Sequence, residues 1–185
     1  MKLIKLICLV LFIAGIGASS FAQSSKPYQK GIGLRISLAN AYYDFVSVSY
    51  KFFISEAGAL ELNGGFGLKS YYYYNGNSNS YSKPFIPDIS ASYQHHFEIP
   101  VRGGGFFWFV GGGLTMYRAF SSFGDHDGFG FGLFPTGGVD YKIPKIPLAV
   151  SADYRPTFFL TKPDFYDGVY GANFGVSARY TIGEK

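Results

Sequence analysis

The chain has 185 residues, a single cysteine, 25 glycines and an aromatic content of 20%, with a formal net charge of +4. Its abundance of Tyr, Phe, Gly and Ser, together with few Leu, Glu and Lys helix formers, excludes a mainly helical protein and favours an all-β one. No segment after the first twenty residues has an apolar run long enough to cross a bilayer as a helix.

Residues 1–22 have the pattern of a secretory signal peptide. Lys2 and Lys5 precede an apolar run over residues 6–18, and Ser20-Phe21-Ala22 fits the small-residue rule for cleavage. A transmembrane helix is the alternative, but the run is well short of the ~20 residues that a bilayer core requires. We therefore expect an exported protein that is cleaved after Ala22.

Residues 23–185 are expected to form one mature domain. Cleavage removes Cys8, so the mature domain has neither thiol chemistry nor a disulfide. Loss of Lys2 and Lys5 lowers the formal charge from +4 to +2, which gives no basis for binding nucleic acid.

Eight segments of alternating character follow in chain order and are separated by turn residues. Because successive side chains of a strand point to opposite faces of a sheet, this alternation predicts β-strands. The predicted strands cover residues 31–39, 45–54, 59–72, 86–98, 106–119, 129–142, 148–160 and 169–182.

Each predicted strand has one apolar and one polar face. In the first, Ile32, Leu34 and Ile36 alternate with Arg35, and in the last, Tyr170 and Ala172 begin a long apolar face. All but one of the charged residues within the strands share the polar face, the exception being Arg118. This predicted charge network contains Arg35, Lys51, Glu61, Lys69, Asp88, Glu98, Asp140, Lys142, Asp153, Arg155 and Arg179.

The two faces distinguish a soluble barrel from a membrane barrel. A soluble eight-stranded barrel needs an apolar interior, whereas a membrane barrel has an apolar band outside and polar side chains within. The apolar face carries too many Phe, Tyr and Trp rings for a narrow interior. We therefore predict an eight-stranded antiparallel up-and-down transmembrane β-barrel whose lumen is filled by polar and charged side chains.

Connection lengths and aromatic positions agree with this orientation. Short connections follow the second, fourth and sixth strands, and longer ones follow the third, fifth and seventh, as the periplasmic turns and outer loops of membrane barrels do. Rings are expected at the two membrane interfaces. The outer girdle is predicted to contain Tyr42, Tyr43, Tyr71 to Tyr74, Phe120 and Phe158, and the inner girdle Phe52, Phe97, Phe106, Trp108, Tyr141 and Tyr180.

The last strand, Gly175-Val176-Ser177-Ala178-Arg179-Tyr180-Thr181-Ile182, looks like the terminal strand that barrel-assembly machinery recognises. With the architecture above, it resembles the small outer-membrane barrels of the OmpX and OmpA transmembrane-domain type, in the form found in Bacteroidetes-like proteins. The resemblance covers nearly the whole mature chain. It implies integral location in the outer membrane among lipid and lipopolysaccharide, and assembly by that machinery.

Candidate chemical sites are few. Asp125-His126-Asp127, with Asp164 and Asp167 elsewhere, offers metal-ligand atoms, but adjacent residues rarely converge on one ion. His96 shares a face with Ser92 and Glu98, yet no hydrolase motif surrounds it. We expect neither an enzyme nor a cofactor or metal site.

Two classes of function fit these patterns. The favoured one is a structural or surface-interaction barrel that acts through the outer loops of residues 73–84 and 120–128. In the first of these loops, the Tyr and Asn residues of 73–77 suit recognition of an extracellular ligand, and the competing interpretation is a solvated aromatic girdle that runs into a flexible loop. The alternative is a small pore or channel for hydrophobic or small polar solutes, which requires a continuous lumen or a side opening.

Overall fold

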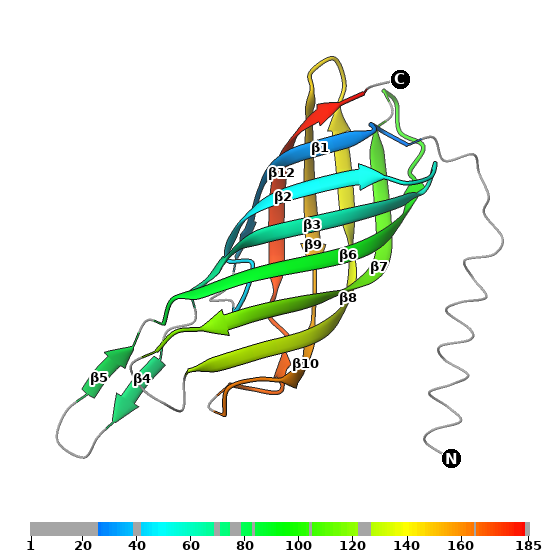
Figure 1. The fold of residues 1–185 in the computed structure, drawn as a ribbon. Helices are drawn as coiled ribbons and strands as arrows, with labels where there is room; N and C mark the ends of the chain where they lie inside the picture. The colour runs from blue at the N-terminus through cyan, green and yellow to red at the C-terminus, as the bar shows by residue number, and fades with distance from the viewer. Residues whose placement is uncertain are drawn as a thin grey trace, which may run out of the picture.

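The computed structural model describes residues 26–38, 42–68, 71–74, 79–82, 84–103, 105–121, 127–164 and 166–183, and the regular structure in these ranges is entirely β (Figure 1). The strands are β1 (Lys30–Ser37), β2 (Val46–Phe53), β3 (Gly58–Gly67), β4 (Tyr71–Tyr74), β5 (Asn79–Ser82), β6 (Ile86–Glu98), β7 (Phe106–Ala119), β8 (Gly128–Ile143), β9 (Leu148–Tyr154), β10 (Thr157–Thr161), β11 (Val169–Tyr170) and β12 (Phe174–Ile182). Within the same ranges, no helix has the length and apolar character required to cross a bilayer.

Antiparallel pairing closes the sheet into a barrel. Consecutive strands pair in order, and the first barrel strand, β1, also pairs with the last, β12, in a register that joins Lys30 to Ile182. The strand β9–β10 is interrupted at Arg155 and Pro156, where proline cannot donate a ladder hydrogen bond. Counting β9–β10 and β11–β12 as one interrupted strand each gives eight, which confirms the predicted fold class.

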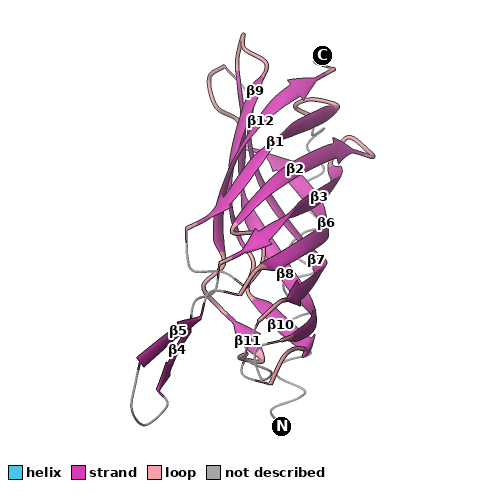
Figure 2. Cartoon of the chain, turned by 60° about the vertical axis from the view of Figure 1, so that its left-hand side comes forward, coloured by secondary structure: helices cyan, strands magenta, loops and turns pink. Residues whose placement is uncertain are grey.

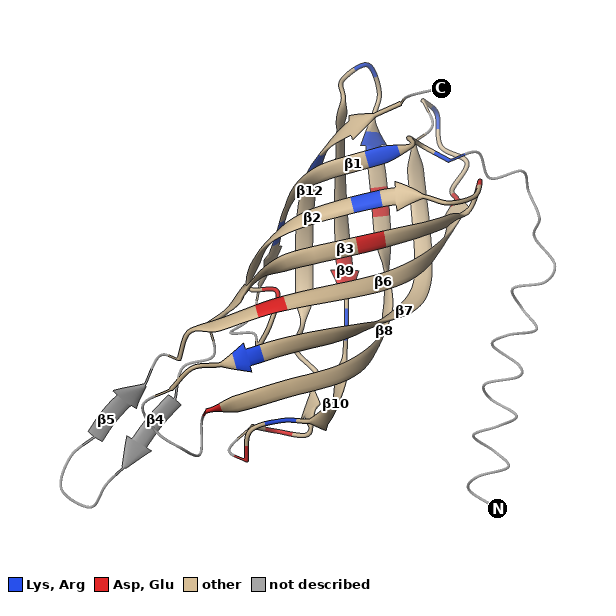
Figure 3. Cartoon of the chain, viewed as in Figure 1, with Lys and Arg blue, Asp and Glu red and all other residues tan. Residues whose placement is uncertain are grey.

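Side-chain exposure follows the predicted alternation. Along β12 every second residue is buried, beginning with Gly175 and ending with Thr181. Apolar side chains point outward, and Leu34 and Ile89 are 52% and 60% exposed. Along the strands, single charged residues are separated by stretches of uncharged residues, and the other charged residues lie mostly in the connections (Figure 3). The barrel therefore has a polar interior and an apolar outer surface.

The two ends of the barrel differ. Three short connections, residues 54–57, 99–105 and 144–147, lie at the end where β1 begins and β12 finishes. The connection after β3 lies at the opposite end and contains the separate two-stranded sheet β4–β5, which projects from the barrel (Figures 1 and 2). The predicted third strand was too long, because β3 ends at Gly67 and Tyr71 and Tyr72 belong to this hairpin.

The start of the eighth predicted strand does not follow the predicted alternation of inward and outward side chains. Tyr170 was predicted to point outward, but it is only 6% exposed and packs inside the barrel mouth. Residues 171–173 separate β11 from β12 and shift the alternation, so that Val169 rather than Tyr170 faces outward. Periodicity alone could not reveal this break, because the residues on both sides keep strand character.

Candidate functional site

Arg155 is the centre of the charge network inside the barrel. Its guanidinium group contacts three carboxylates: Nη2 lies 2.6 Å from Glu61 Oε1, Nε 2.8 Å from Asp153 Oδ1, and Nη1 3.3 Å from Asp44 Oδ2. The Arg155 side chain has no exposed surface. These contacts join the end of β9 to β3 and to the connection between β1 and β2, so one cation holds three parts of the wall together.

Two further arginines extend this network along the barrel. Arg35 forms a bidentate pair with Asp153, with Nη2 to Oδ1 at 2.7 Å and Nε to Oδ2 at 3.1 Å. Arg179 lies 3.0 Å from Glu61 and donates to the hydroxyls of Ser49 and Ser151. Planar guanidinium groups suit such multiple contacts, since each offers five donors in a fixed fork.

A second cluster lies nearer the end where β1 begins. Lys51 Nζ is 2.6 Å from Asp140 Oδ2, and the Tyr28 hydroxyl donates to the same oxygen at 3.0 Å. His96 Nε2 lies 3.6 Å from this carboxylate, and the Lys51 ammonium group stands 4.8 Å from the Phe109 ring centre. His96 therefore belongs to a buried polar cluster, and neither Ser92 nor Glu98 forms a hydrogen bond with its ring.

Other predicted network residues have different surroundings. Asp88 is buried and accepts a hydrogen bond from the Asp44 backbone N–H at 3.0 Å. Lys142 is also buried, and its amine donates to the Ile143 and Ile146 carbonyls at 3.1 and 2.8 Å. Lys69 lies outside the described residues.

The structure does not place Glu98 in the network, which corrects its predicted position. Glu98 is the last residue of β6 and is exposed, although it is in phase with the buried His96. An inward-facing side chain at the rim of a barrel reaches solvent instead of the lumen, and strand alternation does not distinguish these two positions.

Asp44 is a network residue that the sequence pattern missed. It lies in the connection between the first two predicted strands, yet it is fully buried, pairs with Arg155 and accepts a hydrogen bond from Ser90 Oγ at 2.7 Å. Its φ of 54° turns the chain inward just before β2, in a region that Asp adopts more readily than most residues. The excess of predicted cations over carboxylates was the only sign of a further acid.

Aromatic side chains close the barrel mouth next to Asp44. Tyr42 and Tyr43 were predicted to belong to the outer girdle, but they are buried, at 1% and 0% exposed. The Tyr43 hydroxyl lies 2.6 Å from Thr157 Oγ1, and the Tyr42 hydroxyl donates to Asp167 at 2.9 Å. The buried cluster comprises Tyr42, Tyr43, Ile86, Tyr117, Ala119, Phe134, Tyr166 and Tyr170.

Aromatic side chains of the girdles also have defined contacts on the outer surface. Phe97 and Trp108 stack with ring centres 4.2 Å apart near the end where β1 begins. At the other end, Phe120 and Phe158 are about half exposed, and Arg118 pairs with Asp127 at 2.8 Å. For Tyr71 to Tyr74 the structure describes the backbone but not the side chains, so their place in the outer girdle stays a prediction.

The predicted metal ligands that lie within the described residues, Asp127 and Asp167, have other partners. His126 and Asp125 lie outside the described residues, while Asp127 pairs with Arg118 and Asp167 with Tyr42. Across the described ranges, no group of three His, Cys, Asp or Glu residues is arranged to hold a metal ion.

Comparisons with known proteins give no relative: no family model, curated protein or solved structure matches this chain. The likeness to small membrane barrels therefore consists of the closed, eight-stranded antiparallel architecture.

The packing of the lumen predicts that it does not conduct. The Arg35, Arg155 and Arg179 side chains have no surface that water can reach, so no water path passes them. In planar bilayers, we expect the refolded protein to give no stable unitary conductance above that of protein-free detergent. Long-lived openings of uniform amplitude would contradict this prediction and favour the pore.

Proposed function

We propose that this protein is an integral outer-membrane barrel that serves as a rigid, closed frame for a surface-recognition hairpin. The observation that carries the proposal is the inverted distribution of polarity. Arginines and carboxylates are buried, while Ile32, Leu34 and Val48 of neighbouring strands are about half exposed. An apolar surface of this extent is unfavourable in water, but it suits contact with lipid chains.

Strand dimensions and outer-surface charges support the same environment. A strand crosses a tilted path through a bilayer in about 9–11 residues, and β7 and β8 have 14 and 16 residues. Arg118 is near an end of the barrel, where a lipid-facing charge costs less than at mid-membrane. Lipid and lipopolysaccharide would surround such a barrel, and barrel-assembly machinery would insert it.

Cell fractionation tests the membrane location directly. Expressed with residues 1–22 in a Gram-negative host, the protein should be recovered in the outer-membrane fraction and should migrate faster on gels when unheated than when boiled. Recovery as a soluble periplasmic protein would contradict the proposal.

The recognition role rests on the hairpin β4–β5. It forms a sheet of its own beyond the barrel, and each strand has one edge that pairs with no other described strand. Free strand edges can bind extended peptides through main-chain hydrogen bonds. The hairpin sequence, residues 71–82, contains only Tyr, Asn, Ser and Gly, residue types that are common in adaptable binding surfaces.

Replacing residues 71–82 with a short Gly-Ser linker should separate recognition from folding. We expect proteoliposomes of the intact protein to bind members of a glycan and matrix-peptide array, and the linker variant to bind them at least tenfold less. The barrel itself should keep its heat-modifiable mobility, since β3 and β6 pair directly without the hairpin. An Ile146→Ser variant, altered at the opposite end, is the control. Equal binding by all three proteins would refute the recognition role.

A further inference from the structure

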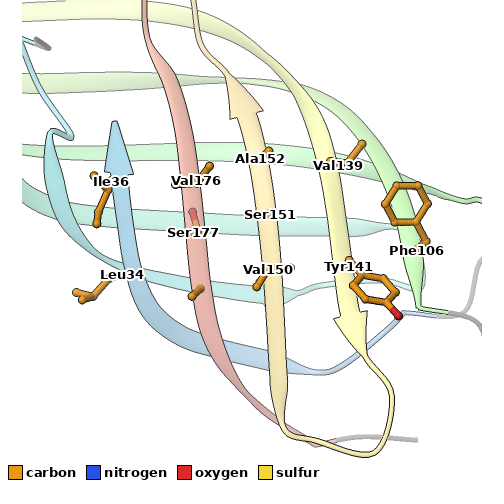
Figure 4. A pocket seen from close by; sticks show the side chains of 11 residues that line it. Leu34, Ile36, Phe106, Val139, Tyr141, Val150, Ser151, Ala152, Val176 and Ser177 are labelled. Carbon is orange, nitrogen blue, oxygen red and sulfur yellow. The ribbon is translucent and has the colours of Figure 1, made fainter. Parts of the chain in front are cut away.

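A hollow of about 630 Å³ lies on the outer surface of the barrel (Figure 4). Its floor is formed by small side chains of two adjacent strands, Val176 and Ala178 of β12 and Val150 and Ala152 of β9. The register places Val176 opposite Ala152 and Ala178 opposite Val150, so the four form a compact block. The surface is recessed here because these side chains are shorter than their neighbours.

Larger side chains surround the recessed block. Leu34 and Ile36 of β1 stand on one side, and Tyr141 and Phe106 stand on the other (Figure 4). Toward the hairpin end, Tyr154 and Phe174 stack with ring centres 4.5 Å apart. Toward the opposite end, Tyr180 is the next outward residue of β12 and is 57% exposed. The hollow is therefore a bounded apolar basin, placed in the half of the barrel that has short turns.

Basic residues lie at the rim next to this basin. Exposed Lys30, Arg102 and Lys145 each lie four residues from a side chain that lines the basin, namely Leu34, Phe106 and Tyr141. Lys30 lies on β1, whereas Arg102 and Lys145 lie in the turns before β7 and after β8. Even a fully extended chain spans at most about 14 Å over four residues, so these cations are within reach of the polar end of a molecule lying in the basin.

Acidic residues at this rim leave an excess of positive charge. Glu56 pairs with Lys26 at 3.7 Å, and Glu98 is the exposed carboxylate nearest the start of β7, through its register pairing with Phe107. Among the described residues of this rim, Glu98 is then the acid that remains beside the three cations Lys30, Arg102 and Lys145. The surface combines an apolar basin with a basic rim, which is complementary to an amphiphile with an anionic head.

We propose that the basin binds an acyl chain of an anionic phospholipid from the periplasmic leaflet, with its phosphate held by Lys145 and Arg102. This inference rests on the proposed membrane location. The basin and its basic rim lie toward the end where β1 begins, whereas the outer loops and lipopolysaccharide would be at the other end. The depth of the site therefore favours a phospholipid over lipopolysaccharide.

Native mass spectrometry of protein released from nanodiscs of phosphatidylethanolamine and phosphatidylglycerol tests this site. We expect the wild type to retain phosphatidylglycerol preferentially. Ala152→Leu with Ala178→Leu, which fills the basin, and Arg102→Glu with Lys145→Glu, which reverses the rim charge, should each lower that retention at least fivefold. Ala91→Leu on the outer face of β6 and Lys162→Glu at the opposite rim are matched controls and should change retention less than twofold.

Two outcomes distinguish this inference from the proposed function. If the wild type inserts into nanodiscs but both pairs of substitutions retain as much phosphatidylglycerol as the controls, the lipid site is refuted and the membrane location stands. If the wild type does not enter bilayers at all, the proposed function fails. Because the rim substitutions are on the surface, they test the site even if the leucine variants do not fold.

Discussion

Replacing Arg155 with Met is expected to lower the free energy of unfolding by about 3–5 kcal/mol, because removal of one partner leaves buried charges uncompensated. Arg155 contacts Glu61, Asp153 and Asp44, and all four side chains are essentially inaccessible. Methionine fills similar space but cannot neutralise the carboxylates. Arg35 and Arg179 remain nearby and still pair with Asp153 and Glu61, so Asp44 loses the closest of its cationic contacts.

Urea unfolding in lipid vesicles, followed by the fluorescence of the single tryptophan, Trp108, measures this change. Arg118→Met is the matched control, because Arg118 forms its ion pair with Asp127 at the surface. Exposed pairs contribute about 0–1 kcal/mol, so the control should be close to wild type. If both substitutions cost the same, the buried network would not be a major source of stability.

Replacing Gly65 with Ala should also weaken the barrel, by roughly 1–3 kcal/mol as overpacked sites generally do. A Cβ at Gly65 would clash with the Val46 carbonyl oxygen and would lie 2.6 Å from Ser47 Cα. Both atoms belong to the backbone of β2, so no side-chain rotation relieves the contact. Strands β2 and β3 must separate locally, and ladder hydrogen bonds weaken.

Gly64 provides a control on the neighbouring residue. A Cβ there points outward and meets only Ile89 Cγ2, at 4.0 Å, which is ordinary contact. Gly64→Ala should leave the unfolding free energy unchanged or raise it slightly, since alanine restricts the unfolded chain. Equal unfolding midpoints for the two variants would show that close approach of β2 does not require glycine at position 65.

The barrel wall was predictable from the sequence because strand alternation is local. Apolar and charged residues alternate at Leu34, Arg35 and Ile36, and successive residues of a strand point to opposite faces of the sheet. Leu34 and Ile36 are therefore predicted on one face and Arg35 on the other. The same rule placed Arg179 and Glu61 on one face before any pairing was known. It could not say that they lie 3.0 Å apart, because that distance depends on the register and closure of the whole sheet.

The closed mouth was not predictable, because it depends on contacts between connections that are distant in sequence. Tyr42 packs against Tyr166 with ring centres 4.9 Å apart, and its hydroxyl bonds to Asp167. In the sequence, Tyr42 and Tyr43 follow the end of a predicted strand, where an interfacial girdle is the usual place for rings. Their inward orientation follows from the turn at Asp44 and from the break after Tyr170.

The pairing of the first and last strands has a consequence for how the molecule is made. Lys30 and Ile182 are neighbours in the barrel, and Arg179, near the end of the chain, neutralises Glu61 in its first third. All residues from Lys30 to Ile182 must therefore have left the ribosome before the seam can form. Until then, Glu61 lacks its ion pair with Arg179, and the edges of β1 and β12 that form the seam are unpaired. Exposed apolar surface and unpaired strand edges make such a chain prone to aggregate between synthesis and closure.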